Sequence, residues 1–270
     1  MNLNSTTFYE FAQIAAKEAG IQLEGKHERM LTNRMAARVR ELELPNYEEY
    51  LQRIQSLPVE MHAFIDSVTT NFTSFFRDPG QFQHLQRTLE AMLRSEPNRV
   101  RIWCAACSTG EEPYSLALTA KQVTQRLGLP SSPVRVLATD INQSVLKGAS
   151  NGVYTTDQLA MVPESLRGYF VRDSTESSDS FRVCREIRES VLFRRLNLCH
   201  AEWDIPGDMD VIFLRNVLIY FDQETQRQVL ARCLEKLKPG GLLYVGACES
   251  VRKMLSGAES IEPSIFRKRS

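Results

Sequence analysis

Two adjacent carboxylates lie in a loop that could bind a small ligand. Glu111 and Glu112 follow a short run of small and polar residues. An apolar run from Val100 to Ala106 precedes this loop and a helical pattern follows from Tyr114, so the carboxylates lie between a buried strand and a helix. Ligands of open α/β sheets bind at this place, outside the carboxyl ends of the strands. The loop is therefore a candidate cofactor site.

The same loop also has a purely structural interpretation. Ser108 lies three residues before Glu111, which is the spacing of a capping box at a helix start. Thr109 and Glu112 have the same spacing. The next predicted strand supports the ligand-binding interpretation of the loop. Asp140 ends this strand, and an acidic residue at that position can hydrogen-bond a ribose diol. An adenosine-type ligand would then lie across the strand ends.

The composition of the loop restricts which adenosine ligand it could hold. A dinucleotide needs a G-x-G-x-x-G loop around its pyrophosphate, whereas this loop has the single glycine Gly110 beside two carboxylates that would repel phosphate. S-adenosylmethionine carries an ammonium and a sulfonium and has no phosphate, so it fits better. The turn Lys238–Gly241 before a final apolar strand recurs in Rossmann-like methyltransferases, although such a turn also occurs in other α/β proteins.

Cys104 and Cys107 form a C-x-x-C pair, a spacing found in redox dithiols and in zinc sites. The sequence contains no second C-x-x-C and no suitably spaced histidine pair to complete four zinc ligands. We therefore interpret both cysteines as small core-filling residues, and we expect free thiols and no metal.

Composition excludes several classes of partner. The 33 basic and 33 acidic residues give zero net charge, so no global field would attract nucleic acid or an anionic membrane. The N-terminus lacks the features of a signal peptide, and no stretch approaches the roughly 20 apolar residues that span a bilayer. We expect a cytoplasmic protein that neither binds nucleic acid nor inserts into a membrane.

Hydrophobic periodicity divides the chain into two parts. Residues 1–72 contain only helical patterns and predict a small helical domain. Its four apolar stripes are Phe8, Phe11, Ile14 and Ala15; Leu31, Met35, Val39 and Leu42; Tyr47, Tyr50, Leu51 and Ile54; and Met61, Phe64, Ile65 and Val68. From about residue 99, β-rich runs alternate with helices, which predicts a mostly parallel sheet. These runs are 99–104, 134–139, 191–196, 210–214 and 242–246.

One segment of the second part departs from this alternation. Two short strand-like pieces, Tyr169–Arg172 and Phe181–Arg185, flank the polar run Asp173–Ser180. This pattern predicts an antiparallel hairpin inserted into the larger domain at about residues 169–190.

The junction between the two parts is unusual for a linker. Thr69–Asp78 combines hydroxyls, an amide, three phenylalanines and Arg77. The segment is either a helix break with aromatic residues that plug the domain interface or a strap that closes over the ligand. The sequence leaves both interpretations open.

A second unusual segment, Lys26–Arg40, contains five basic residues and one acidic residue in a chain of zero net charge. Its apolar side chains point to one side of a helix, and its basic side chains point away from or flank that side. Such a face is either solvated or docks an acidic partner surface.

Six ordered stretches resemble the chemotaxis receptor methyltransferases, the CheR family. They are Thr70–Arg77, Cys107–Ser115, Ala138–Ile141, Asn197–Leu198, Arg215–Phe221 and Leu237–Gly241. The resemblance implies an N-terminal all-helical domain over residues 1–72 and a Rossmann-like S-adenosylmethionine-dependent methyltransferase domain over residues 73–270 that carries the inserted antiparallel β-subdomain. It also implies methyl transfer from S-adenosylmethionine to glutamate side chains of chemoreceptors, which leaves S-adenosylhomocysteine and sets sensory adaptation.

The resemblance also implies roles for individual residues. By ligand part, these are Asn71, Thr73 and Arg77 at the methionyl end, Glu112 near the ligand, Asp140 on the ribose, Asn197 and Leu198 beside the adenine, and Arg215, Asn216 and Tyr220 at the transfer site. We expect Arg77 and Tyr220 to align the reacting groups. For docking to the receptor, the basic helix would supply Arg29, Arg34, Arg38 and Arg40.

Two departures from the family pattern limit these roles. Gly246–Glu249 reads Gly-Ala-Cys-Glu where the family often has Gly-His-Ser-Glu, so we assign no site role there. The run Asp173–Ser180 lacks the glycines of members that grip a receptor C-terminal pentapeptide, so the sequence leaves open whether such a tether is used.

Several questions about partners stay open at this stage. We expect a monomer whose partner is the cytoplasmic helical domain of a chemoreceptor, and the sequence leaves open whether a regulatory adaptor takes part. The alternatives are a methyltransferase with another acceptor, either RNA or a small molecule, and an interaction module that binds S-adenosylmethionine without turnover.

Overall fold

The computed structural model describes residues 3–95, 99–173 and 179–269. Its N-terminal part consists of helices. Their bounds are α1 Ser5–Ala19, η1 Gly25–His27, α2 Glu28–Glu41, α3 Tyr47–Ser56 and α4 Pro58–Val68. The four predicted apolar stripes form a core of their own, in which the rings of Phe11 and Phe64 stack with centroids 5.6 Å apart. The Asn46 side chain caps α3 by accepting the N–H of Glu49 at 2.9 Å.

The second part contains a seven-stranded sheet in the order β6-β2-β1-β7-β8-β10-β9. Its strands are β1 Val100–Cys104, β2 Val134–Asp140, β6 Val191–Arg195, β7 Met209–Leu214, β8 Leu237–Val245, β9 Ala258–Glu262 and β10 Ile265–Lys268. The pairings from β6 to β8 are parallel, whereas β10 runs antiparallel to β8 and to β9. The alternation of strands and helices thus gives the expected Rossmann-like sheet, closed at one edge by an antiparallel hairpin that we did not predict.

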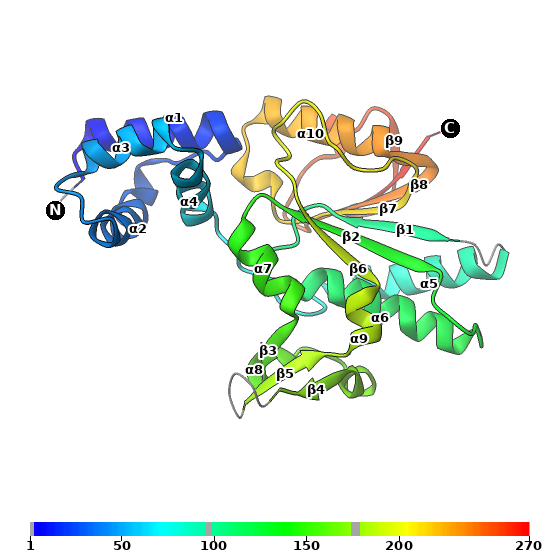
Figure 1. Cartoon of the computed structure of the whole chain (residues 1–270). Coiled ribbons are helices and arrows are strands. Elements are labelled where there is room, and N and C mark those ends of the chain that lie inside the picture. The colour runs from blue at the N-terminus through cyan, green and yellow to red at the C-terminus, as the bar shows by residue number, and fades with distance from the viewer. Residues whose placement is uncertain (1–2, 96–98, 174–178, 270) are drawn as a thin grey trace.

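Helices cover both faces of this sheet (Figure 1). They are α5 Pro79–Ser95, α6 Glu111–Arg126, α7 Gln143–Asn151, α9 Arg185–Glu189 and α10 Gln223–Lys236, with short turns η3 Leu218–Tyr220 and η4 Arg252–Met254. The helices α5 and α6 pack on one face and α10 packs on the other, so strand residues alternate between two apolar cores. Trp103 and Ile102 illustrate this alternation, because adjacent positions of β1 belong to opposite cores.

The predicted insertion is present as a small antiparallel sheet in the order β3-β5-β4. Its elements are β3 Val153–Thr155, α8 Thr156–Leu159, η2 Glu164–Tyr169, β4 Phe170–Arg172 and β5 Ser180–Val183. The hairpin of β4 and β5 agrees with the sequence pattern, whereas the third strand, β3, was missed. Of the polar run between β4 and β5, residues 174–178 lie outside the described residues.

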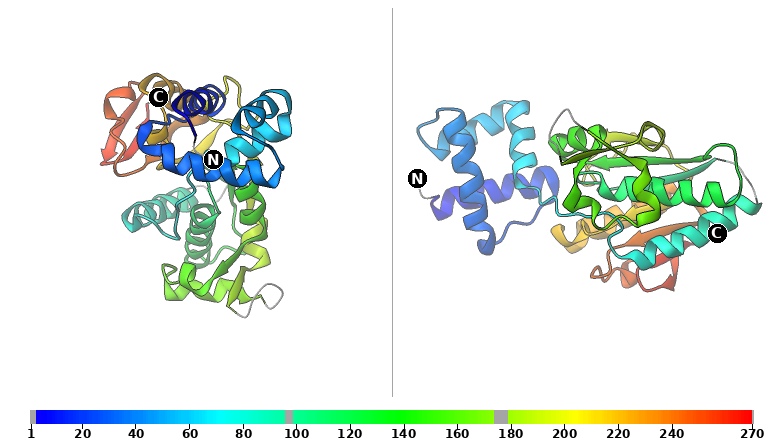
Figure 2. Two further views of the ribbon diagram at one scale, coloured as in Figure 1. Left: turned by 90° about the vertical axis from the view of Figure 1, so that its left-hand side faces the viewer. Right: turned by 90° about the horizontal axis from the view of Figure 1, so that it is seen from below.

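The helical part lies beside the sheet as a separate lobe, and the chain crosses to the sheet through the segment after α4 (Figure 2). The small antiparallel sheet lies at a different corner of the molecule, next to α6 and α9 (Figure 1). Among the described residues, no helix combines the length and apolar character needed to cross a bilayer.

Candidate active site

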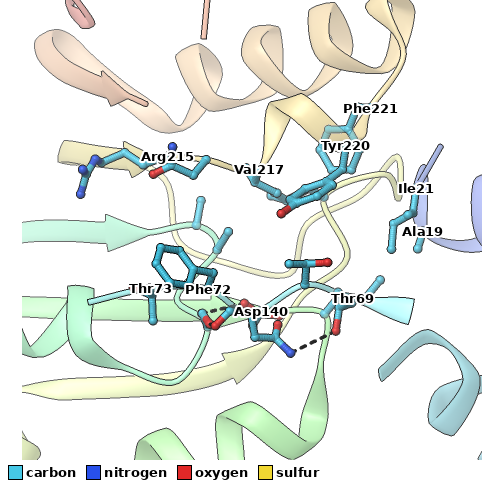
Figure 3. A pocket seen from close by; sticks show the side chains of 18 of the residues that line it. Ala19, Ile21, Thr69, Phe72, Thr73, Asp140, Arg215, Val217, Tyr220 and Phe221 are labelled. Carbon is cyan, nitrogen blue, oxygen red and sulfur yellow. Dashed lines mark hydrogen bonds between the residues drawn. The ribbon is translucent and has the colours of Figure 1, made fainter. Parts of the chain in front are cut away.

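A cavity at the carboxyl ends of β1, β2, β6 and β7 encloses roughly 900 Å³ of space that includes its open mouth (Figure 3). Its wall contains every residue to which the family resemblance assigns a cofactor or transfer role: Asn71, Thr73, Arg77, Glu112, Asp140, Asn197, Leu198, Arg215, Asn216 and Tyr220. The sheet order places β2 and β7 on opposite sides of β1, so the cavity lies where the strand order reverses. Parallel pairing therefore brings together segments that are distant in sequence.

The acidic loop after β1 turns at Gly110, which has φ 99° and occupies the N-cap position of α6. A Cβ there would lie 2.6 Å from the Tyr154 hydroxyl, so both the backbone and the space require glycine. The predicted capping box is wrong. Ser108 Oγ donates instead to Asn71 O at 3.0 Å, and Thr109 Oγ1 donates to Glu111 Oε2 at 2.6 Å.

The two glutamates of this loop point in different directions. Glu112 lines the cavity, whereas Glu111 Oε1 accepts Gln158 Nε2 at 3.1 Å, away from it. Both side chains are buried. Burial raises the pKa of Glu111, although hydrogen bonds from Thr109 and Gln158 act to lower it. Only the carboxylate of Glu112 therefore faces the cavity, and Arg215 and Cys104 already bind it.

Arg215 connects the acidic loop to the segment after α4. Its side chain is fully buried, with Nη1 donating to Glu112 Oε2 at 2.5 Å and Nη2 donating to Asp78 Oδ2 at 2.5 Å. Nη2 also donates to Arg77 O at 2.8 Å. Burial acts to lower the pKa of Arg215, but the charges of Glu112 and Asp78 outweigh it and raise this pKa. The guanidinium thus holds two parts of the cavity wall together.

Asp140 presents a buried carboxylate from the end of β2. Its Oδ2 accepts the N–H of Ser108 at 2.8 Å, and its Oδ1 accepts the N–H of Asn142 at 3.0 Å. Burial raises the pKa of Asp140, and these backbone donors partly offset the rise. Each carboxylate oxygen can accept a further hydrogen bond, so a pair of hydroxyl groups is a suitable ligand.

The segment Thr69–Asp78 contributes to the core of the second part and to the cavity wall, and its phenylalanines do not plug the interface between the two domains. Phe75 plugs the interior, with its ring 4.8 Å from that of Tyr154, whereas Asn71 and Thr73 line the cavity. Phe72 is 78% exposed, and the Arg77 guanidinium lies over its ring at 5.6 Å. Within the described residues, Arg77 has no carboxylate partner, so its charge is available at the cavity wall.

Tyr220 lies across the cavity from Asp140 and Thr69, and its hydroxyl points inward (Figure 3). No hydrogen bond to this hydroxyl is found among the described residues, whereas its backbone oxygen accepts the N–H of Gln22 at 3.0 Å. Asn197 also meets the helical part, because its Nδ2 donates to Glu18 O at 2.6 Å. Ala19 and Ile21 complete this wall, and nothing in the sequence pattern identified them.

Comparisons with known proteins match both parts of the chain. The family described as "CheR methyltransferase, all-alpha domain" matches residues 6–69, and "CheR methyltransferase, SAM binding domain" matches residues 71–264. The chain belongs to the CheR methyltransferase family. The cavity described above lies in this S-adenosylmethionine-binding domain and along its border with the all-alpha domain.

Named relatives of this CheR chain cover most of its length. The "Chemotaxis protein methyltransferase" of Klebsiella aerogenes is 39% identical over 92% of this chain and 84% of its own length. That of Escherichia coli is 38% identical over 92% of this chain and 85% of its own. Among solved structures, the N-methyltransferase NodS from Bradyrhizobium japonicum, in complex with S-adenosylhomocysteine, has a TM-score of 0.39 and 14% identity over 70% of this chain and 87% of its own.

The arginines of the basic helix α2 in this CheR chain lie in two different environments. Arg34 Nη1 donates to Ser67 O at 2.7 Å, and Arg38 forms two hydrogen bonds with Glu60, at 2.8 and 3.1 Å. Arg29 and Arg40 are exposed and have no carboxylate partner within the described residues. Of the four arginines predicted to dock a receptor, two therefore stabilise the helical domain itself.

Cys104 and Cys107 of this CheR chain are both fully buried in the core beside α6, as the core-filling interpretation predicts. Burial raises the pKa of both thiols well above the usual range. In the part of the chain that the structure describes, no group of histidine, cysteine and acidic residues could hold a metal ion.

Proposed function

We propose that this protein transfers a methyl group from S-adenosylmethionine to glutamate side chains of chemoreceptor cytoplasmic helices. Its membership of the CheR family and the names of its relatives support this proposal. The observation that carries it is that residues assigned to one ligand by separate motifs line a single cavity. The product that remains is S-adenosylhomocysteine.

The chemistry of the cavity suits this ligand. Asp140 would accept the ribose hydroxyls, since its oxygens keep free acceptor positions. Asn197 and Leu198 would flank the adenine. Glu112, together with Asn71, Thr73 and Arg77, would hold the methionyl end. We propose that Arg215 and Asn216 act mainly by fixing this wall, because Arg215 already has two carboxylate partners.

The reaction requires little acid or base chemistry from the protein. S-adenosylmethionine supplies an electrophilic methyl group on a sulfonium. A glutamate acceptor has a reference pKa of about 4.3, so its nucleophilic oxygen is ionised at neutral pH and no general base is needed. From its place at the methionyl end, Arg77 would also contact the acceptor carboxylate, and the Tyr220 hydroxyl would orient that carboxylate. Alignment of this kind can lower a barrier by roughly 7–11 kcal/mol.

Receptor docking is assigned to the all-alpha domain. The exposed arginines Arg29 and Arg40 of α2 carry uncompensated charge in a chain of zero net charge. We propose that they contact an acidic receptor surface, while Arg34 and Arg38 stabilise α2 through their hydrogen bonds to α4. The division near residue 72 would then separate receptor docking from methyl transfer.

Transfer of a radiolabelled methyl group to receptor-containing membranes tests the proposal. We expect label on the receptor that is released by mild alkali, because carboxyl methyl esters are base-labile. A receptor whose acceptor glutamates are replaced by alanine is the control. Base-stable label, or label on RNA or a small molecule, would indicate another acceptor, and ligand binding without any transfer would indicate an interaction module.

A further inference from the structure

Glu249 lies outside the cavity, yet its buried carboxylate binds the loop that leads to Tyr220. Oε2 accepts the N–H of Gly246 at 2.6 Å and that of Asn216 at 3.1 Å, and Oε1 accepts the N–H of Leu218 at 2.9 Å. Burial raises the pKa of Glu249, and these backbone donors act to lower it. In the described part of the chain, backbone N–H groups are thus the partners of this charge.

The loop after β7 needs an acceptor from elsewhere. Asn216 has φ 57°, in the left-handed region, and Val217 at the N-cap of η3 provides no side-chain cap. The first N–H groups of a helical turn lack partners inside the turn. Glu249 supplies the missing acceptor to Leu218 from 31 positions away in the sequence.

Gly246 lets the end of β8 approach this loop. A Cβ at Gly246 would lie 2.8 Å from Asn216 Nδ2 and 2.8 Å from Glu249 Oε2. The nearest backbone atom is Asn216 N at 3.0 Å, so an added methyl group would have to displace the Asn216 amide and the Glu249 carboxylate. The loop, Gly246 and Glu249 therefore form one packed unit.

We propose that Glu249 is a positioning residue that places Tyr220 in the cavity by fixing the backbone of Asn216 and Leu218. Tyr220 ends the turn that Leu218 begins, and its own backbone oxygen is bound by Gln22. The loop is thus held at its start by Glu249 and at its end by the helical domain. The catalytic consequence rests on the proposed function, whereas the structural consequence does not.

Hydrogen exchange of the full-length chain tests the structural consequence without a methyl acceptor. The substitution Glu249→Gln replaces an acceptor oxygen with an N–H donor that faces backbone donors. We expect amides of residues 216–220 to exchange at least about tenfold faster, with amides of β1 unchanged. Glu202→Gln, at an exposed glutamate, is the matched control. Unchanged exchange at residues 216–220 would overturn the inference.

Steady-state kinetics test the catalytic consequence. We expect Glu249→Gln to lower kcat about tenfold while the Kd for S-adenosylhomocysteine changes less than about threefold. In a Tyr220→Phe background, the same substitution has little further effect on kcat, because both changes act through one hydroxyl. Fully additive losses would contradict a positioning role. A wild-type protein that methylates no receptor would instead contradict the proposed function and leave the exchange experiment decisive.

A second variant covers the case in which Glu249→Gln fails to fold. Gly246→Ala leaves Glu249 in the sequence but places a methyl group against both its carboxylate and the Asn216 side chain. We expect the same local increase in exchange at residues 216–220. Protection equal to that of the wild type would show that this loop does not depend on its contact with the end of β8.

Discussion

Among the residues of the site, the pairing of charges decides which carboxylates can meet a ligand. The sequence places Glu111 and Glu112 together, but Glu111 turns away from the cavity and Glu112 is bound by Arg215. Asp140, in contrast, has backbone N–H groups as its hydrogen-bond partners. The carboxylate of Asp140 therefore keeps free acceptor positions toward the cavity, whereas both oxygens of Glu112 have partners, Arg215 at Oε2 and Cys104 at Oε1.

Arg77 and Tyr220 provide the most direct test of the transfer site. Arg77→Ala removes a cation that would hold the acceptor carboxylate, and a hydrogen bond to a charged group contributes about 1.5–3 kcal/mol. We expect kcat/KM for receptor methylation to fall by roughly 10–150-fold, and Tyr220→Phe to fall at the lower end of this range. Arg87→Ala, on the surface of α5, is the control. Wild-type rates in both variants would remove these side chains from the mechanism.

Glu111 should make stability depend on pH. Its pKa is raised from 4.5 by burial, so the ionised form destabilises the folded protein at neutral pH, and protonation relieves this cost as pH falls through the raised pKa. Glu111→Gln should therefore raise the free energy of unfolding at pH 7–8 by on the order of 1 kcal/mol. The gain should vanish as pH approaches 4.5. Urea unfolding across this range measures it, and a variant that is less stable than wild type at pH 8 would contradict the sign.

Among the elements, the end of α1 shows how closely the helical part meets the sheet. Gly20 ends α1 with φ 70°, and its N–H bonds to Ala16 O at 2.9 Å. A Cβ at this position would lie 2.4 Å from Cys199 Sγ and 3.1 Å from the Phe221 ring. Glycine is thus required both for the left-handed backbone and for the contact between the two domains.

Two glycine substitutions separate these requirements. Gly128 has φ 67°, and no atom lies within 4 Å of the place that an added methyl group would take. Gly128→Ala should therefore lower the free energy of unfolding by about 1–2 kcal/mol from backbone strain alone. Gly20→Ala should cost about 1–3 kcal/mol more, because of the overlap with Cys199. Adding Cys199→Ala should recover part of that difference. Equal losses in the two single variants, measured by denaturant unfolding, would exclude the steric contribution.

At the scale of the whole molecule, the cavity depends on how the two domains are joined. Asp66 of α4 accepts the N–H groups of Gln143 and Ser144 at 3.0 and 3.1 Å, so its carboxylate lies at the start of α7. Asn142 Nδ2 donates to Thr69 Oγ1 at 2.7 Å, beside the cavity wall. These bonds tie the start of the junction segment to the end of β2.

Removal of the hydrogen bonds that Asp66 accepts from the start of α7 should affect ligand binding as well as stability. Asp66→Ala takes an acceptor and a negative charge from the start of α7, which should lower the free energy of unfolding by about 0.5–2 kcal/mol. We also expect severalfold weaker binding of S-adenosylhomocysteine, measured by calorimetry, because Thr69 and Asp140 line the same cavity. Asp204→Ala, at an exposed position, is the control. A loss of stability with unchanged affinity for S-adenosylhomocysteine would show that the Asp66 hydrogen bonds do not shape the cavity.

Local pattern was sufficient for four buried parallel strands and insufficient for elements defined by their partners. The turn predicted at Lys238–Gly241 is wrong, because β8 already begins at Leu237. The strands β1, β2, β6 and β7 lie within one residue of the runs predicted from apolar content, because buried parallel strands have a distinct composition. The strand β3 and the hairpin of β9 and β10 were missed. They are short or lie at a sheet edge, and strands of that kind are stabilised by pairing more than by their own residues. The capping box failed because Gly110 takes the N-cap position in a left-handed conformation.

Periodicity and the residue types at strand ends were enough to predict the helical N-terminal part, four of the parallel strands and a candidate ligand loop after β1. The contacts between distant side chains, in contrast, became visible only in the folded chain. Arg215 reaches Glu112 across 103 positions, and Glu249 reaches Leu218 across 31. Contacts of this kind form because parallel strands end at one edge of the sheet and because some loops adopt left-handed conformations. Packing of the whole core stabilises both features, and no local sequence pattern encodes them.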